Sequence, residues 1–545
     1  MKIALIQMNP TVGALKENTE KILSFIQEAQ KNGADLVVFP ELSITGYPPQ
    51  DLIFEPNFVT KNRTFCEKIA RETQTLDIVS LVGFIDNPTK DTYYNAIAVI
   101  CQGKIVDTIY KTLLPTYDVF DEKRYFQSNP SIHPVICNIK GKSVSLGIEI
   151  CEDLWDEAYS IKVTQELVRQ GADIIINCSA SPYSYKKVET RKKQILKKIQ
   201  TYHIPFCYVN CCGGQDELIF DGNSFMVDSH GQWLAHNGSF DETLSYVELD
   251  DTFSAQDTLG EPMFHPDEEL FKALKTGVRD YFRKTGFTDA LLGLSGGIDS
   301  SLVAVIASEA LGSDHVWGII MPSQFSSDHS VKDAIALAKN LGIHYDMYSI
   351  QKIYEIVLET LKKPFEGTPF GLAEENIQAR SRGILLMALA NKFHRLVLTT
   401  GNKTELALGY STLYGDMAGS LAVISDLNKE DVYRLSYFVN QQAGYDRIPE
   451  NILTKIPSAE LREGQTDPFD YAIVSPLVEA LLNQEKSLED LVEEGYDREL
   501  VCHIKKLIFQ AEYKRRQTPP GLRVTEKAFG MGRKMPIVNK YMDDD

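Results

Sequence analysis

The stretch Leu291-Leu292-Gly293-Leu294-Ser295-Gly296-Gly297-Ile298-Asp299-Ser300-Ser301 decides the fold of the C-terminal half of this 545-residue chain. An apolar run, a loop with two glycines and the apolar residues 302–306 predict a strand, a loop and a helix in succession. The glycines let backbone N–H groups approach a phosphate, and the start of the helix adds partial positive charge. The stretch therefore predicts a phosphate-binding loop, with an ordinary helix cap as the plain alternative.

This loop is not of the kinase type, because it does not end in Gly-Lys-Ser or Gly-Lys-Thr. Asp299 offers an oxygen ligand to Mg²⁺, which prefers carboxylates together with substrate phosphates. A second segment, Thr399-Thr400-Gly401-Asn402-Lys403-Thr404-Glu405, follows the predicted strand 395–398 and reaches the same edge of the sheet. Glu405 is thus the candidate second ligand for Mg²⁺, the alternative being a helix cap.

The pattern around the loop predicts an α/β fold. Predicted strands at 290–294, 316–321, 345–350 and 395–400 alternate with predicted helices at 301–311, 330–341 and 374–393. Such alternation requires right-handed crossovers and gives a doubly wound parallel sheet, whose ligands bind at the carboxyl ends of the strands. This domain is expected to span residues 267–545.

The first 250 residues carry a different pattern, and 251–266 lose periodicity and collect turn residues, which marks a linker. Helices are predicted at 15–31 and 186–202. Short β-rich runs are found at 2–8, 35–39, 78–85, 96–100, 144–150, 173–178 and 206–210. A layered α/β or α+β domain at 1–250 follows.

Composition excludes several classes of protein. With 43% apolar and 24% charged residues, the chain has the balance of a soluble enzyme with two large domains. The net charge of −19 argues against nucleic acid as a partner. No apolar run approaches the roughly 18 residues of a membrane span, and the start does not read as a signal peptide. Nine cysteines, an odd number, favour a reducing compartment, so a cytoplasmic location is expected.

Three residues in the N-terminal half each follow a β run: Glu41, Lys111 and Cys151. A thiol is nucleophilic as the thiolate, so it needs a base or a nearby cation. Glu41 can take the proton, and Lys111 can stabilise an oxyanion together with a backbone N–H. Taken singly, each has a plain alternative: a buried packing cysteine, a turn glutamate and a surface lysine.

The contexts Phe39-Pro40-Glu41-Leu42, Tyr110-Lys111-Thr112-Leu113-Leu114-Pro115 and Ile148-Glu149-Ile150-Cys151-Glu152-Asp153-Leu154-Trp155 resemble the nitrilase amidase family over residues 1 to about 250. The resemblance implies an α-β-β-α layered domain. Family members often place a second acid near the lysine, and Glu122 is the candidate, with a surface role as its alternative. Similarity to the glutaminase members implies that Tyr117, Ser181 and Lys187 bind glutamine.

The C-terminal half resembles the NAD⁺ synthetases. Its glycine loop is similar to the pyrophosphatase-type loop of adenylating enzymes, which cut ATP between the α and β phosphates. The further motifs are 375–380 (Glu-Asn-Ile-Gln-Ala-Arg), 400–405 (Thr-Gly-Asn-Lys-Thr-Glu), 414–417 (Tyr-Gly-Asp-Met), 457–461 (Pro-Ser-Ala-Glu-Leu) and 519–524 (Pro-Pro-Gly-Leu-Arg-Val). The resemblance implies ATP contacts by Gly293, Leu294, Ser295, Gly296, Gly297, Ile298, Asp299, Ser300, Thr400 and Lys429, Mg²⁺ ligands Asp299 and Glu405, and deamido-NAD⁺ contacts by Asn376, Arg380, Glu405 and Lys514.

Together these resemblances imply an enzyme that takes ammonia from glutamine and uses ATP to convert deamido-NAD⁺ to NAD⁺. Internal passage of ammonia and a homo-oligomer are expected with it. The main alternative is another glutamine-fed ligase with the same ATP loop, such as a GMP-synthetase-like enzyme. A non-catalytic assembly or regulatory protein is the alternative of a different class, and the intact Glu41, Lys111 and Cys151 weigh against it.

Overall fold

The computed structural model describes residues 1–250, 253, 258–483 and 486–541. Within it the chain forms two compact units, Met1–Glu269 and Leu270–Asp545, and each is described by itself. The predicted linker at 251–266 includes residues 251–252 and 254–257, which lie outside the described residues.

The first unit contains two six-stranded sheets. One has the order β14 (Thr243–Glu248), β1 (Lys2–Gln7), β2 (Leu36–Val38), β3 (Val79–Thr89), β4 (Thr92–Cys101) and β5 (Lys104–Tyr110). The other has the order β13 (Trp233–His236), β12 (Phe225–Val227), β9 (Phe206–Asn210), β8 (Ile174–Ser179), β7 (Lys142–Ile150) and β6 (Val135–Ile139). A separate hairpin pairs β10 (Cys212–Gln215) with β11 (Leu218–Asp221).

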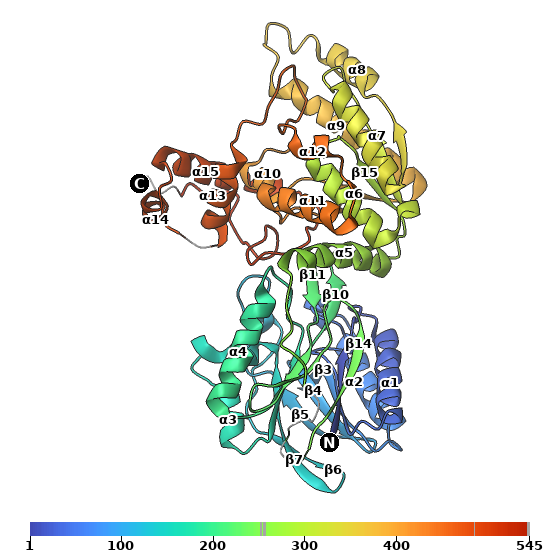
Figure 1. Cartoon of the computed structure of the whole chain (residues 1–545), viewed down its shortest axis with the longest axis vertical. Helices are drawn as coiled ribbons and strands as arrows, with labels where there is room; N and C mark the ends of the chain where they lie inside the picture. The colour runs from blue at the N-terminus through green and yellow to red at the C-terminus, as the bar shows by residue number, and fades with distance from the viewer. Residues whose placement is uncertain (251–252, 254–257, 484–485, 542–545) are drawn as a thin grey trace. The chain divides into compact units, whose positions relative to one another are not determined.

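Alternation of side chains along the strands builds four layers in this unit. Ile3 and Leu5 of β1 pack with Leu146 and Ile148 of β7 in a core between the two sheets. The other face of the first sheet packs on α1 (Leu15–Lys31) and α2 (Phe58–Glu72). The other face of the second sheet packs on α3 (Val163–Arg169) and α4 (Lys187–Tyr202). The result is the expected α-β-β-α sandwich, with both helical layers visible in Figure 1.

The second unit is built on a five-stranded, fully parallel sheet. Its order is β17 (His344–Met347), β16 (Val316–Ile320), β15 (Ala290–Gly293), β18 (Leu396–Thr399) and β19 (Leu421–Ala422). The chain passes from β15 to β16 on one side and later to β18 on the other. The order therefore reverses at β15, and ligands of doubly wound sheets bind at such a point.

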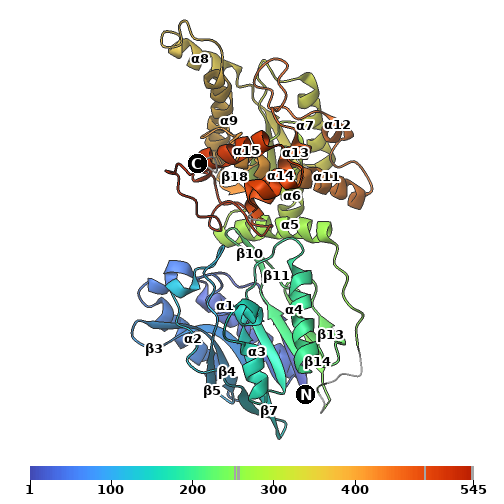
Figure 2. The same ribbon diagram turned by 90° about the vertical axis from the view of Figure 1, so that its left-hand side faces the viewer.

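Helices cover this sheet and extend beyond it. They are α5 (Pro266–Thr285), α6 (Ile298–Leu311), α7 (Asp328–Leu341), α8 (Gln351–Leu361), α9 (Leu372–Phe393), α10 (Lys403–Leu408), α11 (Lys429–Ala443), α12 (Glu450–Thr454), α13 (Tyr471–Asn483), α14 (Leu488–Glu493), α15 (Arg498–Gln510) and α16 (Glu512–Arg515). Leu386 and Ala390 of α9 pack on Leu291 and Ile319 of the sheet. Figures 1 and 2 both show α8 beside α9. A second core joins α10, α13, α14 and α15.

Most of the predicted elements are present, with shifted ends. The predicted helix 15–31 coincides with α1, whereas the helix predicted at 186–202 begins at Lys187 because Lys186 has a left-handed backbone. The predicted strand 345–350 is wrong at its end, since β17 stops at Met347 and Ile350 precedes α8. In the described part of the chain, no helix is long and apolar enough to cross a membrane.

Candidate active sites

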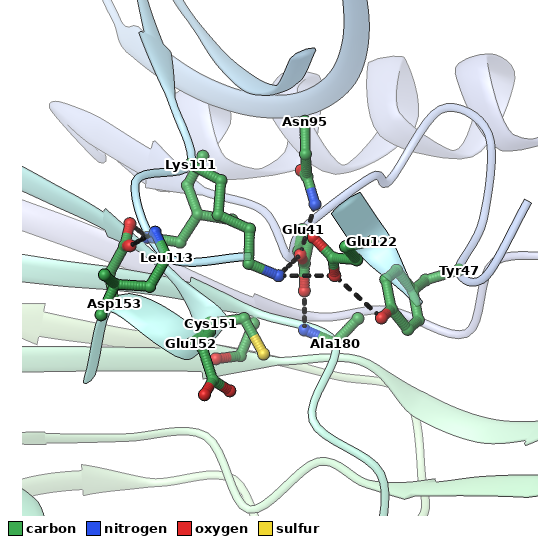
Figure 3. A network of polar contacts seen from close by, with 12 residues as sticks. Glu41, Tyr47, Asn95, Lys111, Leu113, Glu122, Cys151, Glu152, Asp153 and Ala180 are labelled. Atoms are coloured by element: carbon green, nitrogen blue, oxygen red, sulfur yellow. Dashed lines mark hydrogen bonds and ion pairs between the residues drawn. The ribbon is translucent and has the colours of Figure 1, made fainter. Parts of the chain in front are cut away.

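Glu41, Lys111 and Cys151 lie just beyond β2, β5 and β7, and the fold brings them together. Lys111 Nζ lies 2.7 Å from Glu41 Oε1, and electrostatic interactions link the Cys151 thiol to both residues. Figure 3 shows Cys151 beside this ion pair. Glu41 is placed there by a close approach between its loop and β3: a Cβ on Gly83 would meet the backbone nitrogen of Leu42 at 2.3 Å.

Lys111 is shared by two carboxylates. Its Nζ also lies 2.7 Å from Glu122 Oε1, and all three side chains are buried. Burial alone would lower the pKa of Lys111, but the carboxylates of Glu122 and Glu41 outweigh it and raise that pKa. Lys111 is therefore a charged ammonium at neutral pH. Its position matches that of a cation held ready for an oxyanion.

Glu122 lies in the short 3-10 turn η2 (Glu122–Arg124), and it is not a surface residue. Tyr47 donates a hydrogen bond to its Oε1 at 2.9 Å. The pKa of Glu122 is raised overall, because burial and the nearby Glu41 raise it by more than Lys111 lowers it. The sequence pattern did not point to Tyr47.

Both oxygens of Glu41 accept hydrogen bonds. The Asn95 side-chain amide donates to Oε1 at 2.6 Å, and the backbone N–H of Ala180 donates to Oε2 at 2.8 Å. Asn95 lies on β4 and Ala180 follows β8, so the carboxylate is fixed from both sheets. Neither partner was predicted, because no local motif marks an amide or a backbone N–H aimed at a distant residue.

Cys151 is the first residue of the 3-10 segment η3 (Cys151–Ala158), directly after β7. Its φ is 45°, in the left-handed region that residues with a side chain rarely adopt. Burial and the Glu41 carboxylate raise the pKa of the Cys151 thiol, whereas Lys111 lowers it. The free thiol is therefore protonated at neutral pH and needs a base during attack.

Two of the three predicted glutamine-binding residues, Tyr117 and Lys187, interact with the next residue, Glu152. Tyr117, which is 52% exposed, donates to both carboxylate oxygens of Glu152 at 3.1 and 3.0 Å. Lys187 acts on the Glu152 carboxylate electrostatically and lies over the Trp155 ring. Ser181 is buried, and its backbone N–H donates to Asn210. Glu152 was not predicted, although it follows Cys151 in the sequence.

The second unit has a cavity of about 340 Å³ at the carboxyl end of β15. It is lined by nearly all of the residues predicted to bind ATP: Gly293, Leu294, Ser295, Gly297, Ile298, Asp299, Ser300, Thr400 and Lys429. The remaining one, Gly296, supports the loop: its φ is 75°, and a Cβ there would meet the carbonyl oxygen of Ser330 at 2.2 Å. Gly297 precedes α6, whose N-terminus faces this loop.

Asp299, Glu405 and Lys429 form a charged cluster in this cavity. Lys429 Nζ lies 2.5 Å from Asp299 Oδ2 and 3.7 Å from Glu405 Oε1. Burial and the Asp299 carboxylate raise the pKa of Glu405 to about 8. Burial alone would lower the pKa of Lys429, but the two carboxylates outweigh it and raise that pKa.

This cluster fits a magnesium ion that completes its shell with phosphates. Two carboxylates share one cation at the phosphate loop, and Mg²⁺ typically takes one or two carboxylates with substrate oxygens. Among the residues described, no group of three or more His, Cys, Asp or Glu is placed to hold a metal by itself. The Asn402 side-chain amide donates to Asp299 Oδ1 at 2.9 Å, and the Asn402 backbone N–H donates to Glu405 Oε2 at 3.2 Å, so this residue contacts both carboxylates.

Four residues were predicted to bind deamido-NAD⁺, and three of them, Asn376, Arg380 and Lys514, are not part of this cavity lining. These three contact the segment 409–414. Asn376 accepts a hydrogen bond from Thr412, and Arg380 donates to the carbonyl oxygen of Leu413. Lys514 Nζ donates to the carbonyl oxygens of Gly409 and Ser411, at 2.7 Å each. Glu405 lines the cavity itself. The contact between residues 376 and 412 was not foreseeable from their spacing.

The cavity has further polar residues that were not predicted. Arg382, on α9, donates to the carbonyl oxygen of Met321, and burial lowers its pKa to about 10. Glu460 accepts hydrogen bonds from the Ser327 and Ser330 hydroxyls, each at 2.8 Å. The sequence did carry a signal for Arg382. Residues two apart on a helix face different sides, so Arg382 could not share the environment of Arg380.

Comparison with known families defines the class of both units. A family described as carbon-nitrogen hydrolase matches residues 2–256, and one described as NAD synthase matches residues 270–518. The chain therefore combines a region that matches the carbon-nitrogen hydrolase family with a region that matches the NAD synthase family.

Full-length relatives define the family more narrowly. The chain is 45% identical to a glutamine-dependent NAD(+) synthetase from Synechocystis sp. over 99% of each chain, and 41% identical to one from Thermotoga maritima over 100% of this chain and 99% of the relative. A solved glutamine-dependent NAD⁺ synthetase from Acinetobacter baumannii, in complex with ADP, matches at 37% identity and a TM-score of 0.79, over 100% of this chain and 99% of that one. The chain belongs to the glutamine-dependent NAD⁺ synthetase family. A GMP-synthetase-like ligase is not favoured.

Proposed function

We propose that this chain converts deamido-NAD⁺ to NAD⁺, using ATP and ammonia released from glutamine. The proposal rests on the family and on one observation above all: the closed Glu41–Lys111 ion pair beside Cys151. The proposed amidase domain is 1–250 and the proposed synthetase domain is 267–545, joined at 251–266. Glutamate, AMP and diphosphate are the other products.

In the amidase reaction, Cys151 Sγ attacks the side-chain amide carbon of glutamine. Glu41 takes the thiol proton as the C–S bond forms, which the raised thiol pKa requires. The carbonyl oxygen gains negative charge, and Lys111 stabilises it without reorganisation because Glu41 and Glu122 already hold the ammonium in place. Glu41 then delivers the proton to the departing nitrogen, and ammonia leaves.

The thioester on Cys151 is then hydrolysed. Glu41 takes a proton from water, the resulting hydroxide attacks the thioester carbon, and the C–S bond breaks. The proton returns to Sγ and glutamate leaves. Tyr117, Ser181 and Lys187 are proposed to hold the rest of the glutamine, and Glu152 interacts with Tyr117 and Lys187.

In the synthetase reaction, the nicotinate carboxylate attacks the α-phosphorus of ATP and displaces diphosphate. This gives an acyl adenylate, which makes AMP the leaving group. Ammonia attacks the acyl carbon, AMP departs and the amide forms. Residues 293–300, with Thr400 and Lys429, are proposed to hold ATP, and Asn376, Arg380, Glu405 and Lys514 to hold deamido-NAD⁺.

Mg²⁺ is proposed to bind Asp299 and Glu405, where it would neutralise phosphate charge. The Lys429 ammonium is paired with Asp299 and lies near Glu405, and it is proposed to contact a phosphate oxygen of ATP. Asn402 donates a hydrogen bond to each of the two carboxylates, from its side-chain amide to Asp299 and from its backbone N–H to Glu405. Two further expectations belong to this proposal: ammonia passes internally between the two sites, and the chain works as a homo-oligomer in the cytoplasm.

The proposal is tested by supplying ATP, Mg²⁺ and glutamine with either deamido-NAD⁺ or xanthosine monophosphate. We expect glutamine consumption, AMP and NAD⁺ in equal amounts with deamido-NAD⁺ and no amidated product with the other nucleotide. Amidation of xanthosine monophosphate would overturn the assigned substrate. Absence of AMP with both would overturn the adenylating reaction.

A further inference from the structure

Asp153 is a buried carboxylate that no step of the proposed reaction uses. It is 1% exposed and lies two residues after Cys151 in η3. Its Oδ1 accepts the backbone N–H of Leu113 at 2.8 Å and of Thr112 at 3.1 Å. Its Oδ2 accepts the backbone N–H of Ile150 at 3.1 Å. Three backbone donors thus converge on one side chain.

These donors flank two of the proposed reacting residues. Thr112 and Leu113 directly follow Lys111, and Ile150 directly precedes Cys151. Lys111 follows β5 of the first sheet, whereas Cys151 follows β7 of the second. Asp153 is therefore a hydrogen-bonded link between strand ends that belong to different sheets. Figure 3 shows its carboxylate against Leu113, with Lys111 extending from the same loop.

The link acts where small displacements matter. Lys111 must reach the oxygen of the carbonyl that Cys151 attacks, so the distance between the ammonium and the thiol sets the fit to the charged intermediate. The left-handed backbone of Cys151 is costly by itself and persists where its surroundings hold it. The bond from Ile150 N–H to Asp153 holds the peptide directly before that turn.

We propose that Asp153 is a positioning residue that fixes the Lys111 ammonium relative to the Cys151 thiol by clamping the two backbone segments beside them. It touches neither glutamine nor the reacting atoms. Misplacement of a catalytic group by about 1 Å costs roughly 10²-fold in rate. Loss of the clamp lowers the turnover of glutamine rather than its binding. The inference rests on the proposed amidase function.

A purely structural role is the rival explanation, and Asp156 provides a matched control. It is also a buried aspartate of η3, but its carboxylate accepts from Lys198 on α4 at 2.9 Å. Asp156→Asn changes a buried carboxylate of the same segment without touching the Lys111 loop. Asp153→Asn keeps the size of the side chain, but its amide NH₂ group is a donor and would face at least one of the backbone N–H groups that Asp153 now accepts. Asp153→Ser is a second variant, too short to reach Leu113.

The experiment measures glutamine hydrolysis, ammonium-dependent NAD⁺ synthesis and thermal unfolding on the full chain. We expect both Asp153 variants to lower kcat for glutamine by about 10²-fold, with KM changed less than about threefold. Ammonium-dependent synthesis stays at the parent rate, which reports an intact second unit. Asp156→Asn keeps kcat within about threefold of the parent, whatever its unfolding temperature.

Several outcomes overturn the inference. Parent kcat in Asp153→Asn and Asp153→Ser removes the positioning role, and a raised KM at unchanged kcat assigns Asp153 to glutamine binding. An equal kcat loss in Asp156→Asn, or failure of both Asp153 variants to fold while Asp156→Asn folds, assigns it to the fold alone. The parent and Cys151→Ala are run in parallel. A parent that does not hydrolyse glutamine through Cys151 contradicts the proposed function instead.

Discussion

Lys111 and Glu41 form an ion pair that is closed to solvent: the Nζ–Oε1 distance is 2.7 Å, and the side chains are 1% and 0% exposed. A second carboxylate, Glu122, lies at the same distance from the ammonium. Each of these buried ions has lost its hydration, so each depends on its partner for stabilisation. The arrangement thus links the stability of the first unit to its proposed chemistry.

Removing the cation tests that link. Lys111→Met leaves two buried carboxylates without their partner, so we expect the free energy of unfolding to fall by about 3–5 kcal/mol. Glutamine hydrolysis is lost as well. Adding Glu122→Gln to this variant removes one unpaired charge and should restore part of the stability but none of the activity. Chemical unfolding of the three chains is the measurement, and unchanged stability in Lys111→Met contradicts the prediction.

Replacing the nucleophile separates the two reactions. Cys151→Ala should lower glutamine-dependent NAD⁺ formation by about 10³-fold or more, because the thioester cannot form. Synthesis from a high concentration of ammonium salt should remain, since the cavity of the second unit is unchanged. NAD⁺ is followed with each nitrogen donor. Loss of both activities with the fold intact would show that the sites are not independent.

The Cys151 thiol should be alkylated slowly near neutral pH. Burial and Glu41 raise the pKa of this thiol above its ordinary value. The thiolate is therefore the minor species at every pH below the raised pKa. Its fraction then grows about tenfold with each pH unit. We expect the rate of iodoacetamide modification at Cys151 to rise from pH 6 to pH 9 without levelling off. Cys151→Ala corrects for the other free cysteines, and a plateau below pH 8 is the contrary result.

The proposed metal ligands should matter for both nitrogen donors. Asp299→Ala or Glu405→Ala should depress NAD⁺ synthesis from glutamine and from ammonium alike, because adenylate formation precedes amidation. Binding of Mn²⁺, measured directly by electron paramagnetic resonance, should weaken in both variants. Asp314→Ala, at an exposed position of the 3-10 turn η4 (Ser313–His315), is the surface control. Parent rates at limiting Mg²⁺ would rule out the metal role.

Ammonia released at Cys151 should reach the adenylate without mixing with solvent. Near neutral pH free ammonia is mostly ammonium, which has no lone pair for attack, so release would waste glutamine and the adenylate. A sheltered route raises the effective concentration of the neutral nucleophile. We expect an excess of an ammonia-consuming enzyme to leave glutamine-dependent NAD⁺ formation nearly unchanged. Strong suppression would show that ammonia escapes.

The local elements near both sites were predictable from the sequence because their signals are local. Two glycines after the apolar run 291–294 predict the phosphate loop, and the structure has Gly296 at φ 75° against the Ser330 backbone. The period of α1 and the alternation of β7 needed no distant residue. The β runs that precede Glu41, Lys111 and Cys151 placed these three residues after strands, which is where they lie.

The contacts that complete the sites could not be predicted, because they join segments far apart in the chain. Ala180 N–H donates to Glu41 across 139 residues, and Thr412 donates to Asn376 across 36. Such partners are fixed by sheet order and by the packing of the layers. A backbone N–H carries no sequence signal.

The sequence by itself determined the fold class, the family and the chemical identity of the reacting groups, since these depend on residue types in short ordered motifs. The tertiary structure alone decided which charges neutralise one another: Lys111 with both Glu41 and Glu122, and Lys429 with Asp299 and Glu405. The physical reason is burial. An ionisable side chain withdrawn from water is governed by the few groups within several ångströms of it, and only the folded chain selects those groups.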